Sequence, residues 1–145
     1  MLAIRRRLSS IIDLTADCAG ARDLSACLQE AARCVGAESS VPINRTDWAA
    51  EFGREPSYLH VVRCPDDWID ESLRVTSGGR LYLYLNKDTL ASSATRLSSE
   101  ASGAVQLPAE FITVRENSDA TTSRSVHIYM FVGDRPDSPR IARNQ

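Results

Sequence analysis

The chain has 145 residues, a length that suits one domain with a hydrophobic core. Its apolar fraction of 43% and charged fraction of 25% argue against wholesale disorder. The net charge of −2 argues against non-specific binding to nucleic acid, because such binding requires a clustered positive field. No apolar run approaches the length of a membrane-spanning helix, so we expect neither a nucleic acid nor a membrane as partner.

The first residues, MLAIRRRLSSIIDL, lack the continuous apolar segment of a secretory signal. We therefore expect a cytoplasmic protein whose four cysteines are free, buried thiols. Cys27 and Cys34 lie seven residues apart in a predicted helix, roughly 10 Å along its axis, which is too far for one zinc ion or a disulfide. A pairing of Cys18 with Cys64 stays open. We expect no metal and no cofactor.

Of the 17 basic residues, all but Lys87 are arginine. Two explanations stay open, a genome rich in G and C or selection against lysine modification in a protein delivered into a host cell. Arg5, Arg6 and Arg7 point in three directions if helical, so they are expected to form a solvated face rather than a binding patch.

Helical spacing of apolar residues predicts a first helix over residues 2–18 that ends or bends at Gly20. A second helix is predicted from Asp23, a good N-cap, to Gly36. Its apolar stripe consists of Leu24, Cys27, Leu28, Ala31 and Val35.

The next segments are shorter. SSVPIN (39–44) reads as an edge strand because Pro42 has no N–H to donate to a central ladder. RTDWAAEFG (45–53) predicts one or two helical turns, and SYLHVVRC (57–64) predicts a strand. PDDWIDES (65–72) predicts a short helix, since proline suits the first helical position and carboxylates suit the positive helix end.

Residues 73–86 change to a period of two, with Leu81, Leu83 and Leu85 on one side and Tyr82 and Tyr84 on the other. The Gly78–Gly79 pair before Arg80 could belong to a phosphate-binding loop or to a hairpin turn. We favour the hairpin, because the glycines lie between two strand patterns instead of preceding a helix N-terminus.

Asp88 is the predicted cap of a third helix that ends at Gly103, and residues 105–117 and 123–133 predict two more strands. This order indicates an α+β fold, a mainly antiparallel sheet with N-terminal helices and an interrupting helix, in a two- or three-layer sandwich. We expect one domain over residues 1–133 and an extended or mobile tail over 134–145.

His60 and His127 fall in predicted strands and could form a catalytic pair if those strands were neighbours. Because no nucleophile signature such as G-x-S-x-G accompanies them, we expect ordinary strand histidines and no catalytic residue. The acidic residues Asp66, Asp67, Asp70 and Glu71 could bind a divalent metal, but a solvated acidic turn is favoured.

Two stretches carry a partial resemblance to known families. ARDLSACLQEAARCVGAESSV (21–41) resembles the opening helix and first strand of GAF-type sensory domains. VVRCPDDWIDESL (61–73) is similar to a segment of the autoinducer-binding domains of quorum-sensing regulators, in which a tryptophan lines the acyl-homoserine-lactone pocket. The resemblance implies an α-β-α sandwich with Trp68 facing a ligand. GGRLYLYLNKDTLASSA (78–94) is similar in layout to NAD-degrading toxin domains of the RES type.

The leading hypothesis is a small, soluble, non-enzymatic regulatory or protein-interaction domain that also senses a small molecule, with Trp68, Arg80, Tyr82 and Tyr84 as ligand-binding residues. A protein partner and a homodimer are expected. Two alternatives stay open, a viral, phage or secretion-associated assembly protein and a small NAD-cleaving enzyme that uses Arg80.

Overall fold

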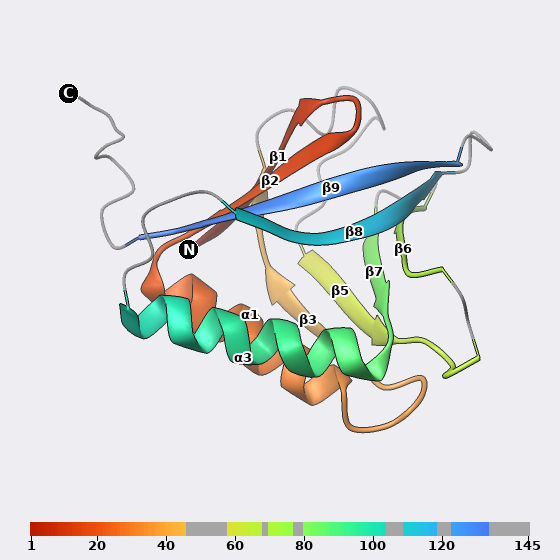
Figure 1. Cartoon of the computed structure of the whole chain (residues 1–145), viewed down its shortest axis with the longest axis horizontal. Helices are drawn as coiled ribbons and strands as arrows, with labels where there is room; N and C mark the ends of the chain where they lie inside the picture. Colours follow the sequence, from red (N-terminus) through yellow and green to blue (C-terminus); the bar gives the residue numbers. More distant parts are fainter. Residues whose placement is uncertain (46–57, 68–69, 77–79, 104–108, 119–122, 134–145) are drawn as a thin grey trace.

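A computed structural model describes residues 1–45, 58–67, 70–76, 80–103, 109–118 and 123–133. Within these ranges the chain forms nine strands and two helices (Figure 1). In chain order they are β1 (Leu2–Leu8), β2 (Ile11–Ala16), α1 (Cys18–Ala31), β3 (Glu38–Pro42), β4 (Asn44–Arg45), β5 (Tyr58–Arg63), β6 (Ser72–Val75), β7 (Leu81–Leu85), α3 (Lys87–Gly103), β8 (Ala109–Ser118) and β9 (Ser123–Val132).

All nine strands belong to one sheet, in the order β3-β5-β7-β6-β8-β9-β2-β1-β4. Four neighbouring pairs are antiparallel, namely β1–β2, β3–β5, β6–β7 and β8–β9. The other four, β2–β9, β5–β7, β6–β8 and β1–β4, are parallel. The fold is therefore α+β, as predicted, but its sheet is mixed rather than mainly antiparallel.

The two helices lie side by side along one side of the curled sheet (Figure 1). Ser25 of α1 joins them, because its hydroxyl donates to the Ala94 carbonyl of α3 over 2.8 Å and lies 2.9 Å from the Ser98 hydroxyl. The core forms between the helices and the inward side chains of the strands, and it includes Leu24, Leu28, Leu90, Leu97, Val61, Leu83 and Ile128.

The predicted N-terminal helix over residues 2–18 is wrong. This segment forms the antiparallel hairpin of β1 and β2, with Ile4 opposite Leu14. The helical stripe required Leu8 to face the core, yet Leu8 is 58% exposed. The buried positions instead alternate, with Leu2 and Ile4 in β1 and Ile12, Leu14 and Ala16 in β2, which is the period of a half-buried strand.

The second predicted helix exists but is displaced. It starts at Cys18 because Asp17 is the N-cap, with its carboxylate accepting from the Gly20 N–H over 2.7 Å. Gly20 does not break the helix. A Cβ atom there would lie 2.1 Å from the Met1 carbonyl oxygen, so glycine permits β1 to approach the helix closely.

Later elements largely follow the predictions. The edge strand at Pro42, the strand before Pro65, the hairpin of β6 and β7, and the two final strands are confirmed. The short helix over 65–72 is wrong, since Asp66 and Asp67 form a turn and Ser72 already begins β6. Predictions for 46–53, Gly78, Gly79 and the tail 134–145 lie outside the described residues.

The third helix is confirmed, but its cap is Asn86 rather than Asp88. The Asn86 side-chain carbonyl accepts from the Thr89 N–H over 2.8 Å, and its main-chain carbonyl accepts from the Leu90 N–H over 3.0 Å. In the part of the chain that the structure describes, no helix is both long and apolar enough to cross a membrane.

Candidate functional site

Side chains on β5, β6 and β7 that point away from the helices form the surface we call the outer aromatic face. It consists of Tyr58, His60, Arg74, Tyr82 and Tyr84. Its origin is the two-residue period of β7, whose leucines are buried while Tyr82 and Tyr84 remain partly exposed on the opposite side. The pairing of β7 with β5 and β6 places His60 and Arg74 beside Tyr82 on this surface.

The rings of this face are stacked in a row. The His60 and Tyr82 rings are 4.8 Å apart at 22°, and the Tyr82 and Tyr84 rings are 6.1 Å apart at 26°. Tyr58 continues the row with its ring 6.5 Å from His60, and 50% of Tyr58 is exposed. Such ring pairs stabilise their own arrangement beyond the area they bury, so the row is preorganised.

Charged groups flank the row on both sides. The Arg74 guanidinium lies over the Tyr84 ring, 4.9 Å from its centroid, and its Nε donates to the Ser72 hydroxyl over 3.3 Å. On the opposite side, the Glu38 carboxylate of β3 lies 3.0 Å from Nδ1 of His60. The face therefore has an apolar, aromatic centre between a cation and an anion.

Two of the predicted ligand-binding residues, Tyr82 and Tyr84, lie together in this row. Arg80 is exposed just before β7, where its N–H donates to the Thr76 hydroxyl over 3.2 Å. By alternation it belongs to the same side of β7 as the two tyrosines. Trp68, the fourth predicted residue, lies outside the described residues.

Sequence reasoning did not assign Tyr58, His60 and Arg74 to this site. The sequence does indicate that Tyr58 and His60 share one side of their strand, because they are two residues apart, as are Tyr82 and Tyr84. The missing information was the parallel pairing of β5 with β7, which places His60 beside Tyr82. Nothing in the two segments themselves specifies that pairing.

The two histidines do not form a pair, because β7, β6 and β8 lie between β5 and β9 in the sheet. His127 instead belongs to a local cluster, with its Nδ1 2.8 Å from Glu110 Oε2 and 3.2 Å from the Thr113 hydroxyl. Hydrogen bonds from Thr113 and His127 lower the pKa of Glu110. Since both partners meet the same ring nitrogen, the cluster lacks the geometry of a nucleophile–base–carboxylate triad.

The cysteines are all free, so Cys18 and Cys64 are not bonded. Cys18, Cys27 and Cys64 are buried, as predicted, whereas Cys34 is exposed because α1 ends before it. Burial raises the pKa of the Cys27 and Cys64 thiols, which keeps them protonated.

The acidic segment does not gather into a metal site. Asp66 pairs with Arg63 over 3.2 Å, Asp70 lies 3.9 Å from Arg115, and the Glu71 carboxylate accepts from the Asn86 N–H over 2.8 Å. Among the described residues no group of three potential metal ligands converges.

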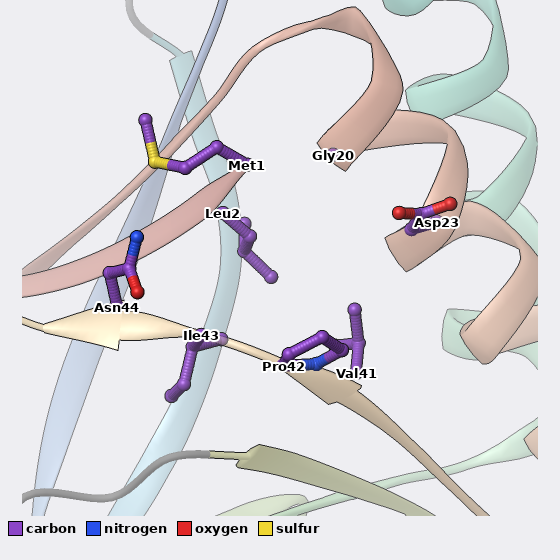
Figure 2. A pocket seen from close by; sticks show the side chains of 8 residues that line it. All are labelled: Met1, Leu2, Gly20, Asp23, Val41, Pro42, Ile43 and Asn44. Atoms are coloured by element: carbon purple, nitrogen blue, oxygen red, sulfur yellow. The ribbon is translucent and has the colours of Figure 1, made fainter.

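A small hollow of about 230 Å³ lies between β1, the start of α1, β3 and β4 (Figure 2). Its walls are mainly apolar, with Leu2 from β1, Val41 and Pro42 from β3, and the polar residue Asp23 from α1. None of the predicted ligand-binding residues lines it.

No family model, curated protein or solved structure matches this chain. The resemblance to GAF-type and autoinducer-binding domains therefore stays a prediction.

Proposed function

We propose that this chain is a small interaction domain that binds a protein partner through the outer aromatic face. The observation that carries the proposal is the continuous row of Tyr58, His60, Tyr82 and Tyr84, flanked by Arg74. Tyrosine and arginine are enriched where proteins bind one another, because they combine a large contact area with polar groups.

Preorganisation supports this role. Each ring of the row is held by the next, and Arg74 is held by Tyr84 and Ser72, so binding immobilises few additional side chains. Ordering rotamer-rich side chains costs about 0.5–1.5 kcal/mol each, and a preformed surface avoids part of that cost.

Photo-cross-linking tests the proposal. A photoreactive amino acid in place of Tyr58 reports on the face, and the same amino acid in place of Val35, in the turn after α1, is a control with matched exposure of 51% against 50%. We expect cross-linking to a protein from position 58 and not from position 35. Equal yields at both positions, or none at position 58, would contradict the proposal.

The other functions predicted from the sequence are tested separately. Small-molecule sensing predicts that Trp68→Ala loses ligand binding and retains the fold. The assembly-protein alternative predicts a stable oligomer or one dominant partner. The NAD-cleaving alternative predicts release of nicotinamide from NAD by the wild-type chain and a loss of that release in Arg80→Ala. Absence of nicotinamide release by the wild-type chain would remove that alternative.

A further inference from the structure

We infer that the partner of the outer aromatic face is a second copy of this chain, bound face to face about a two-fold axis that runs along β7. The inference rests on the proposed function, since it specifies the partner of the same surface. It is carried by the order of charges across five adjacent strands of the sheet.

One row of side chains crosses these strands at a single level. Register places Glu38 of β3 beside Val62 of β5, Val62 beside Tyr84 of β7, Tyr84 beside Ser72 of β6, and Ser72 beside Arg115 of β8. The anion and the cation thus stand two strands from β7, on opposite sides of it.

A two-fold axis along β7 exchanges the two sides of that row. Glu38 of each copy then faces Arg115 of the other. One axis therefore creates two equivalent ion pairs, each between a carboxylate and a guanidinium. This self-complementarity is what a two-fold interface requires, because the same patch must fit itself. Two sheets that pack face to face keep their strands nearly aligned, which an axis along β7 also satisfies.

Both charged side chains are available for this exchange. Glu38 is 48% exposed and bound to His60, while Arg115 is 45% exposed and lies 3.9 Å from Asp70. Exposed ion pairs of this kind contribute little to stability, so replacing or sharing them costs little.

The neighbouring row fits the same axis. It runs from Ser40 through His60, Tyr82 and Arg74 to Asn117. Tyr82 lies on the axis and faces its own counterpart, while His60 faces Arg74 of the second copy.

Charge reversal tests the interface. Glu38→Arg and Arg115→Glu, each alone, bring like charges together twice, and we expect each to weaken dimerisation at least about tenfold in sedimentation equilibrium. An equimolar mixture of the two variants carries opposite charges at both contacts, so it should form a mixed dimer with an affinity near that of the wild type. Circular dichroism of each variant verifies the fold.

Arg80 supplies an independent check, because the axis directs the two Arg80 side chains towards each other. Arg80→Ser should therefore tighten the dimer, whereas Arg33→Ser, in the exposed turn after α1, should leave it unchanged. A dimer that both charge reversals leave intact would exclude this face as the interface.

A monomeric wild type at 100 μM, a concentration on the order of that at which weak specific dimers are populated, would overturn the inference. It would leave the proposed function standing if position 58 cross-linked to a different protein. A monomer with no cross-link from position 58 would overturn both.

Discussion

Glu116 shows how a single residue can depart from its usual environment. This carboxylate is nearly completely buried, because alternation in β8 places it on the inward side with Val114 and Ile112. It is paired with Arg6 of β1 and with Arg124 of β9, the latter over 3.1 Å. The three side chains connect strands from both ends of the described chain, and they explain why a charged residue at position 6 is compatible with the inward side of β1.

Replacing Glu116 tests this role. Glu116→Ala would remove a nearly completely buried carboxylate that pairs with both Arg6 and Arg124, and we expect the free energy of unfolding to fall by about 3 kcal/mol. Glu116→Gln retains the shape and one acceptor, so it should cost less. Urea denaturation of both variants measures the difference, and a loss below about 1 kcal/mol for alanine would contradict the expected contribution.

Secondary-structure elements were predictable where local pattern and packing agreed. The two-residue period of residues 81–85 predicted β7 and its two sides, including the position of Tyr82 and Tyr84. The helix prediction for residues 2–18 failed because Ile4, Leu8 and Ile11 fit a helical spacing, whereas the buried positions of the hairpin alternate and leave Leu8 exposed. The pairing of β2 with β9 stabilises the strand conformation of this segment, and the partner residues lie more than 110 positions away along the chain.

The Asn86 side chain caps the start of α3. Asn86→Ala removes the acceptor of the Thr89 N–H and should lower stability by about 1 kcal/mol. Asp88→Ala removes a favourable charge from the first turn and should cost about 0.3 kcal/mol. Thermal unfolding compares the two variants directly. A larger loss of stability for Asp88→Ala than for Asn86→Ala would contradict the assignment of Asn86 as the cap.

The whole molecule depends on long-range pairing. β3, β5, β7, β6 and β8 form one side of the sheet, and β2, β1 and β4 form the other, with β9 between them. Strand β2 pairs with β9 in parallel, with Ala16 beside Val132. No local signal in either segment indicates this contact, which explains why the sequence predicted the strands of the second half but not their order.

This topology predicts the order of folding events. Because β2 and β9 close a very long loop, we expect that contact to form after the transition state. Leu14→Ala in β2 should therefore mainly accelerate unfolding, whereas Leu83→Ala in the local β6–β7 hairpin should mainly slow refolding. Stopped-flow measurements over a range of urea concentrations distinguish the two effects. Equal slowing of refolding by both variants would contradict this order.

The central position of β9 has a consequence for biosynthesis. A ribosome adds roughly 5–20 residues per second, so each residue of β2 is made roughly 6–23 s before its partner in β9. Throughout that interval the apolar side of the β1–β2 hairpin has no sheet to join. The nascent chain therefore exposes the apolar side of this hairpin until β9 has been made, which makes it a natural client for chaperones that bind at the ribosomal exit.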